Sequence, residues 1–191
     1  MRAAILGIFL VLAGCIAAKS MVCDDGSLAL PESISTHGGK LLGMWSCPAG
    51  PVSSSGGSGN ATDVIRTLGK ETLDLCATSC TTHCKKSGDA GPIASDCLTL
   101  ADYYAKSGRF VIKHGRYIIW AYQTCKITQF NHLHRDISYC YDRHNWAGIV
   151  DHIAERCEAK KGRLGGSCDF FDDSRSSRIV VVPVDPGVLL R

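Results

Sequence analysis

The segment CATSCTTHC, residues 76–84, places three cysteines four residues apart, with a histidine directly before the last one. On an α-helix, side chains at i, i+4 and i+8 lie along one stripe, so this spacing predicts a cysteine-bearing helix within residues 63–88. The first and last sulfurs on such a helix are about 12 Å apart, which is too far for one metal ion. The chain also has no Cys-x-x-Cys redox pair. The pattern therefore favours disulfide bonds over a metal or redox site.

The N-terminus indicates the compartment in which these cysteines function. Arg2 precedes an apolar stretch, residues 3–12, and small residues follow it. This layout predicts a secretory signal peptide over residues 1–18 and a secreted, extracellular mature protein. The sequence LAGC at residues 12–15 resembles a bacterial lipoprotein cleavage box, which leaves open whether Cys15 is removed with the signal or lipidated. No later stretch has the roughly 18 apolar residues of a membrane span, so no transmembrane segment is expected in the mature chain.

The cysteine count supports the same interpretation. Eleven cysteines are present, and setting Cys15 aside leaves an even number, which in an exported chain predicts a disulfide framework. The predicted disulfide-forming residues are Cys23, Cys47, Cys76, Cys80, Cys84, Cys97, Cys125, Cys140, Cys157 and Cys168. Their pairing cannot be deduced from the sequence. The formal net charge of +3 is too small to favour nucleic acid as a partner, and the sequence predicts no cofactor and no metal.

Composition divides the chain into segments. Residues 19–62 carry little hydrophobic periodicity and include the Gly/Ser-rich stretch PAGPVSSSGGSGN at 48–60, so they are interpreted as an N-terminal extension and linker. Asn60 begins an Asn-Ala-Thr glycosylation acceptor sequence within that linker. The cysteine-bearing helix is expected at 63–88. Residues 89–184 form the predicted α+β domain, and 185–191 a tail.

Periodicity within residues 89–184 predicts two helices and several strands. One helix begins near Pro92 and ends at Ser107-Gly108, and a second begins near Arg143 and ends at Gly162. Strands are expected at 110–112, 116–125, 136–141, 167–171 and 178–184, and residues 126–130 either continue the second strand or bend away from it. This order predicts an α+β two-layer sandwich: an antiparallel sheet of four to five strands, two main helices on one face, and disulfides as staples.

The histidines are the candidates for catalysis. His132 and His134 stand two residues apart and would share one strand face as a metal or acid–base pair. A small secreted ribonuclease needs a base, an acid and a cation, and the residue types exist in His114, Glu155 and Arg116. Their spacing does not single them out, and the motifs Gly-x-Ser-x-Gly and His-Glu-x-x-His are absent. The favoured interpretation places His132 and His134 in a polar loop of a protein that is not an enzyme.

The aromatic residues of 116–125 offer a third possibility. Trp120 and Tyr122 share one face of the predicted strand, while Tyr117 lies on the other. If exposed, these rings would form a sugar-binding platform, as in a carbohydrate-binding module. Core packing is the commoner use of such a strand and is the favoured interpretation.

One connected series of motifs resembles a known family. Asp96-Cys97 in a short helix, Gly108-Arg109-Phe110-Val111 at a strand, Thr124-Cys125, and Gly165-Gly166-Ser167-Cys168 follow one another in the order of the fungal necrosis-inducing-factor domain. That domain is an extracellular-effector family related in plan to killer toxins. The resemblance covers residues 92–184. Phe110 stands where the family has tryptophan, and the cysteines of 76–84 exceed the usual set.

The resemblance implies an extracellular effector or toxin-like protein and transfers no catalytic residues. Together with the signal peptide, it predicts a secreted, cysteine-rich fungal virulence or killer-toxin-like protein that acts on a host or competitor cell by binding. The implied partner is a cell-surface protein, a glycan or a membrane component. A secreted hydrolase and a carbohydrate-binding module are the alternatives.

Overall fold

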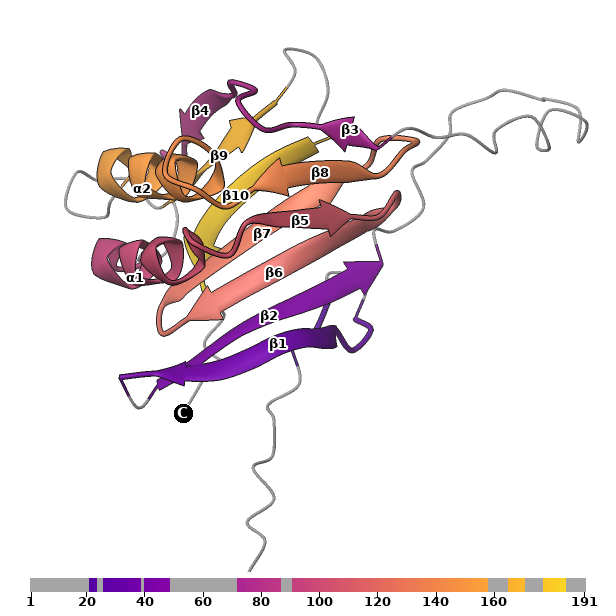
Figure 1. Ribbon diagram of the computed structural model, residues 1–191. Helices are drawn as coiled ribbons and strands as arrows, with labels where there is room; N and C mark the ends of the chain where they lie inside the picture. The colour runs from indigo at the N-terminus through magenta and orange to yellow at the C-terminus, as the bar shows by residue number, and fades with distance from the viewer. Residues whose placement is uncertain are drawn as a thin grey trace, which may run out of the picture.

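The computed structural model describes residues 21–23, 26–38, 40–48, 72–86, 91–157, 165–170 and 177–184 (Figure 1). The predicted signal peptide, Cys15, Asn60 and the tail 185–191 lie outside the described residues. Among the helices in these ranges, none has the length and apolar character needed to cross a membrane.

The centre of the molecule is a seven-stranded sheet in which every pair of neighbouring strands is antiparallel. Its strand order is β1-β2-β6-β7-β10-β9-β4. The strands are β1 (Leu30–His37), β2 (Lys40–Pro48), β6 (Arg116–Tyr122), β7 (Cys125–Asn131), β10 (Ser177–Pro183), β9 (Gly166–Asp169) and β4 (Thr81–Cys84). The predicted α+β class with an antiparallel sheet is confirmed, but the sheet is larger than the four to five strands expected.

Strands β6 and β7 form the hairpin at the middle of this sheet. Tyr122 pairs with Cys125, so the chain reverses through Gln123 and Thr124, and Gln123 has a φ of 50°. Residues 126–130 therefore bend back instead of continuing the preceding strand. A two-residue hairpin loop of this kind matches the twist of its strands when a central residue takes a positive φ.

A smaller sheet lies over one face of the large one (Figure 1). It contains β3 (Leu73–Asp74), β8 (Ile137–Cys140) and β5 (Arg109–Ile112), in the order β3-β8-β5. Strand β8 pairs antiparallel with β5 and parallel with β3. The inward side chains of β5 and β8 join the same buried cluster as Ile118 and Trp120 of the large sheet, so the two sheets share one core.

The two helices, α1 (Ala94–Tyr104) and α2 (Trp146–Arg156), pack against each other and against this same face. Helix α1 contacts β6 and β7, and α2 contacts β4, β9 and β10. The α1 side chains at Cys97, Leu100, Ala101 and Tyr104 are buried, as their helical spacing predicted. At the start of α1, Asp96 Oδ2 accepts hydrogen bonds from Thr124 N–H at 3.1 Å and from Thr124 Oγ1 at 2.6 Å, which fixes the helix to the β6–β7 hairpin.

The opposite face of the sheet is covered by residues from the N-terminal region. Met21, Cys23 and Ala29 pack with Trp45 and Tyr117 in a second buried cluster. Within the predicted N-terminal extension and linker, residues 19–62, the segments Leu30–His37 and Lys40–Pro48 supply two strands of the sheet, and Met21, Cys23 and Ala29 supply part of its cover. Strand β2 was not predicted from the sequence because both of its faces are covered, and strands covered on both faces lack the alternation of apolar and polar residues.

The segment CATSCTTHC does not form the predicted helix. Over the described part, residues 72–86, the chain forms β3, a turn with Ala77 at a φ of 63°, and β4 paired with β9. Cys80, Thr82 and Cys84 are half-buried, while Thr81 and His83 are exposed, which is the alternation of a strand. Alternate residues of a strand share one face, so cysteines four residues apart also lie on one face of a strand. The β-branched threonines of the segment favour the extended conformation.

Five disulfide bonds hold these elements together, which confirms a cysteine-rich, disulfide-bonded protein. The three cysteines of the segment each join a different element: Cys76 bonds Cys140 of β8, Cys80 bonds Cys168 of β9, and Cys84 bonds Cys157 at the end of α2. The other bonds are Cys23–Cys47 and Cys97–Cys125. The segment thus connects both sheets and a helix, which partly replaces the hydrophobic contact that a small chain lacks.

Candidate functional site

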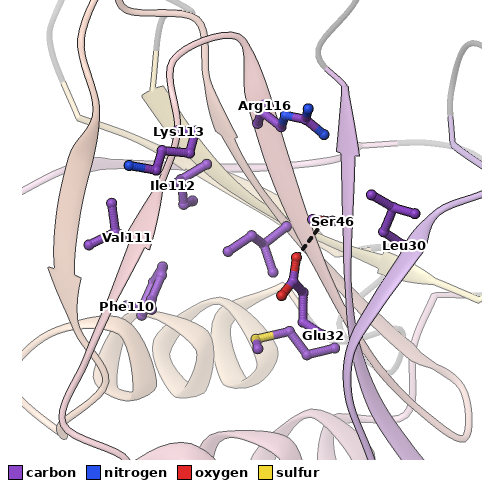
Figure 2. A pocket seen from close by; sticks show the side chains of 10 residues that line it. Leu30, Glu32, Ser46, Phe110, Val111, Ile112, Lys113 and Arg116 are labelled. Atoms are coloured by element: carbon purple, nitrogen blue, oxygen red, sulfur yellow. Dashed lines mark hydrogen bonds between the residues drawn. The ribbon is translucent and has the colours of Figure 1, made fainter.

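A groove of about 450 Å³ lies between the two sheets, and we call it the β5 groove (Figure 2). One wall is the strand β5, the other is the hairpin β1–β2, and β6 lies between them. The residues that line it are Leu30, Glu32, Met44, Ser46, Phe110, Val111, Ile112, Lys113, Arg116 and Ile118. The groove exists because the small sheet covers only part of the larger sheet's face and leaves the β1–β2 hairpin beyond it (Figure 1).

Alternation along β5 decides which side chains enter the core beside the groove. Phe110 and Ile112 are 8% and 1% exposed, whereas Val111 is 47% exposed on the other face of the strand. The Phe110 ring packs edge-on against Trp120, with centroids 5.2 Å apart. Met44 and Ile118 contribute further apolar surface from β2 and β6. The groove therefore has an apolar lining built on well-packed aromatic residues.

The outer edge of β5 is the second feature of the groove. Within the described ranges β5 pairs with β8 alone, so it is an edge strand. Tyr141 N–H donates to the Gly108 carbonyl at 3.0 Å, and in an antiparallel ladder every second residue pair exchanges hydrogen bonds. The backbone groups of Phe110 and Ile112 consequently point toward β8, and those of Arg109 and Val111 point away from it. These outward groups are hydrogen-bonding positions without a strand partner in the part of the chain described.

Glu32 is the charged group of the opposite wall. Its carboxylate accepts a hydrogen bond from Ser46 Oγ at 2.6 Å, and Figure 2 shows this contact inside the groove. The register of β1 against β2 shifts between Pro31 and Ser33, and this irregularity falls at Glu32. No ion pair neutralises Glu32 among the described residues. The groove therefore presents a carboxylate that a basic group can neutralise.

Two cations lie at one end of the groove, and their surroundings differ. Lys113 Nζ contacts Asp136 Oδ2 at 2.8 Å, and His114 N–H donates to the other oxygen at 2.9 Å. The bond from Lys113, followed by that from His114, lowers the pKa of Asp136. Arg116 is exposed, and its guanidinium forms no ion pair within the described ranges. Lys113 thus stabilises the turn from β5 to β6, while Arg116 is available to an anionic group.

His132 and His134, the candidate catalytic pair, lie in the loop after β7, as the favoured interpretation placed them, and neither lines the β5 groove. The His132 ring stacks on Phe130, with centroids 5.6 Å apart and an interplanar angle of 14°. Burial first, and then the nearby charge of Arg178, lowers the pKa of His132, so the neutral ring is favoured. The structure instead brings His134 close to His114, with ring centroids 5.8 Å apart, and both are exposed.

Of the remaining residues of the ribonuclease hypothesis, Arg116 lies near these rings and Glu155 lies on another element. Glu155 lies in α2, on a different element from every histidine named above. Arg116 begins β6 and pairs with Asn131, close in the sheet to these histidines. Across the described residues, no group of three or more His, Cys, Asp or Glu side chains is placed to hold a metal ion.

The aromatic residues proposed as a sugar platform are buried. Trp120 is 0% exposed, Tyr117 2% and Tyr122 9%. Trp120 packs in the core beneath the helices and Tyr117 in the cluster on the other face, as the alternation predicted. The interpretation of these rings as core residues is confirmed, and they present no flat surface to a sugar.

A second hollow, of about 350 Å³, lies between the cysteine segment and the start of α2. It is lined by the Cys80–Cys168 disulfide, by threonine and serine hydroxyls, and by Arg143, His144 and His152. Arg143 is bound by the carboxylates of Asp102 and Asp151, so its charge is already neutralised. This hollow has less apolar lining than the β5 groove, although Thr82 brings the edge strand β4 to its rim.

Sequence reasoning did not find the β5 groove, because its residues come from four strands that are distant along the chain. The only local signal was the short apolar strand 110–112, whose edge position depends on the topology. Comparison of the chain with protein-family models, with curated proteins and with solved structures finds no match.

Proposed function

We propose that this chain is a secreted, disulfide-stapled effector of killer-toxin-like type, which acts on a host or competitor cell by binding rather than by catalysis. The observation that carries the proposal is the β5 groove, where an apolar lining, an unpaired strand edge and the carboxylate of Glu32 occur together. Apolar concave surfaces with a few placed polar groups are the usual sites of recognition.

The scaffold supports this role. Proteins that use disulfides for stability are typically exported, and five bonds between distant segments suit a small protein in an oxidising environment. The signal-peptide pattern of residues 1–18 points to the same destination. A stapled scaffold also holds a binding groove in one shape, which reduces the entropy lost on association.

The two alternatives have less support. A carbohydrate-binding module would need exposed aromatic rings, and Trp120 is buried. A ribonuclease would rely on the exposed pair His114 and His134, because His132 is packed on Phe130. Neither histidine of that pair lines the β5 groove or the second hollow.

The test is a binding experiment with labelled, oxidised mature protein on intact plant and fungal cells. We expect saturable binding that unlabelled protein displaces and that Val111→Lys weakens by about tenfold or more, because a charge beside the strand edge opposes apolar contact. Ile93→Lys is the matched control, since Ile93 is 58% exposed at the N-cap position before α1, and it should bind as the wild type does.

Two outcomes would contradict the proposal. Equal binding by the two lysine variants would remove the groove from recognition. Turnover of RNA by the purified protein that His134→Ala abolishes, with cell binding unchanged, would replace binding by catalysis as the activity.

A further inference from the structure

We propose that the β5 groove receives an extended peptide segment of a partner protein, which adds as a new strand to the edge of β5 and places a basic side chain against Glu32. This inference rests on the proposed function, because it takes the groove to be the recognition surface. It goes further by stating the chemical class of the ligand and the way in which the ligand binds.

The backbone of β5 supplies the first part of the argument. The outward N–H and C=O groups of Arg109 and Val111 form two donors and two acceptors along one line. An added strand satisfies such groups with its own backbone, and this main-chain pairing gives affinity with little dependence on sequence. The Lys113 carbonyl already accepts from Arg116 N–H at 3.1 Å, so the exposed edge ends there.

Side-chain alternation supplies the second part. In a strand added to β5, every second side chain would share the face of Phe110 and Ile112 and would point toward the floor formed by Met44 and Ile118. The intervening side chains would continue the exposed face of Val111. The groove therefore selects a segment with apolar residues at alternate positions on its floor-facing side.

Charge supplies the third part of the argument and determines the direction in which the peptide strand binds. Glu32 projects into the groove from the wall opposite β5, and Arg116 lies toward the end near Lys113 (Figure 2). A floor-facing lysine or arginine would neutralise Glu32, and an acidic group further along the peptide would meet Arg116. Two opposite charges at separate positions distinguish one register and direction of the added strand from the others.

The same features argue against other occupants. A glycan would seek stacked aromatic surfaces, and the groove exposes none of the tyrosine or tryptophan rings of β6. A second copy that paired through its own β5 would meet the basic side chains of Arg109 and Lys113, which are held beside the strand by ion pairs with Asp74 and Asp136. Basic residues that flank an exposed strand commonly prevent such self-association.

The experiment uses synthetic eight-residue peptides and the full oxidised mature protein. The probes carry threonine at odd positions, and valine, one lysine and one aspartate at even positions, with a fluorophore at one end. Fluorescence anisotropy measures binding, and amide hydrogen exchange reports on Arg109 and Val111. We expect at least one probe to bind saturably and to slow exchange at Val111.

Variants separate strand addition from general adhesion. Glu32→Lys should weaken the lysine probe by about tenfold and should improve binding of the probe in which glutamate replaces lysine. Methylation of alternate backbone nitrogens in the peptide should abolish binding, because it removes the donors that pair with β5. Ile93→Lys should leave all affinities unchanged.

Three results would overturn the inference. The first is probe binding that neither backbone methylation nor Glu32→Lys alters. The second is a concentration-dependent dimer that Val111→Lys dissociates, which would make a second copy the occupant. The third is an absence of binding by every probe while Val111→Lys still weakens binding to cells, since the proposed function would then stand and only the peptide ligand would fail. Loss of the cell-binding effect would instead remove the proposed function.

Discussion

At the scale of single residues, His132 illustrates how packing changes the protonation of a histidine. Its ring lies on Phe130 of β7, and Arg178 of β10 places its Cζ 5.2 Å from the centre of the same Phe130 ring. Burial and the Arg178 charge both disfavour the imidazolium, so the pKa of His132 is lower in the folded protein than in the unfolded chain. Such a histidine contributes to the pH dependence of stability and is poorly suited to act as an acid.

The sign of this effect gives a prediction. Above about pH 6.5 the ring is neutral in both states and adds no pH dependence. As the pH falls below that value, the unfolded chain binds a proton that the folded protein resists, so the free energy of unfolding decreases. Urea unfolding between pH 7.5 and pH 5 should show this decrease, and His132→Gln should flatten it.

Carboxylates titrate in a separate window. The pKa values of Asp136 and Asp142 are lower in the folded protein than in the unfolded chain, so both carboxylates stabilise the fold above about pH 3.8. This stabilisation is lost as the pH falls through their pKa values in the folded protein. If the free energy of unfolding of His132→Gln falls as steeply between pH 7.5 and pH 5 as that of the wild type, a group other than His132 is responsible for the decrease.

At the scale of elements, β9 depends on a glycine that fits between strands. A Cβ on Gly166 would lie 2.4 Å from the His83 carbonyl oxygen and 3.0 Å from Cys157 Sγ. Both neighbours are constrained, the first by the β4–β9 ladder and the second by its disulfide with Cys84. The close approach of β4 to β9 therefore requires glycine at this position.

We expect Gly166→Ala to lower the free energy of unfolding by about 2–4 kcal/mol, because the strands must separate to admit the methyl group. Gly115→Ala is the control: Gly115 has a φ of 64° and open space around it, so the cost there is the backbone strain of about 1–2 kcal/mol. Denaturant unfolding of both variants measures the difference. An equal or smaller loss in Gly166→Ala would contradict this account of the β4–β9 contact.

The same elements show what the sequence could and could not predict. The two helices and the strands β5, β6, β8, β9 and β10 have periodic apolar residues facing the interior, and their existence was predicted correctly. Residues 126–130, which form most of β7, were left open between continuing the preceding strand and bending away from it. The segment 76–84 was wrongly predicted to be a helix, because a four-residue spacing places cysteines on one face of either a helix or a strand. The strand forms because residues 81–84 pair with β9, which is distant along the chain. Strand β1 is almost wholly exposed, so it has no buried face to produce alternation.

The candidate site was beyond prediction for a related reason. The β5 groove is defined by where one sheet stops covering another, and β1, β2, β5 and β6 all contribute to it. No local pattern marks a residue such as Glu32, whose place in the groove follows from a register shift in β1. The interpretation of Trp120 and Tyr117 as core residues was correct, since both lie in buried clusters.

At the scale of the whole molecule, the cysteine segment is a connector. Its three disulfides span 64, 88 and 73 residues and join it to β8, β9 and the end of α2. Long closed loops restrict the unfolded chain strongly, by roughly 4 kcal/mol each in the chain-entropy description. The segment thereby holds the small sheet and α2 against the large sheet, and so it preserves the geometry on which the β5 groove depends.

The most direct test of this account is the disulfide map of the secreted, oxidised protein, obtained by proteolysis and mass spectrometry without reduction. The account predicts linked peptides for Cys76–Cys140, Cys80–Cys168 and Cys84–Cys157, and a gain of ten hydrogens by the intact mature chain on reduction, since each of the five disulfides takes up two. A bond between two cysteines of residues 76–84, or a free thiol at any of the three, would contradict it.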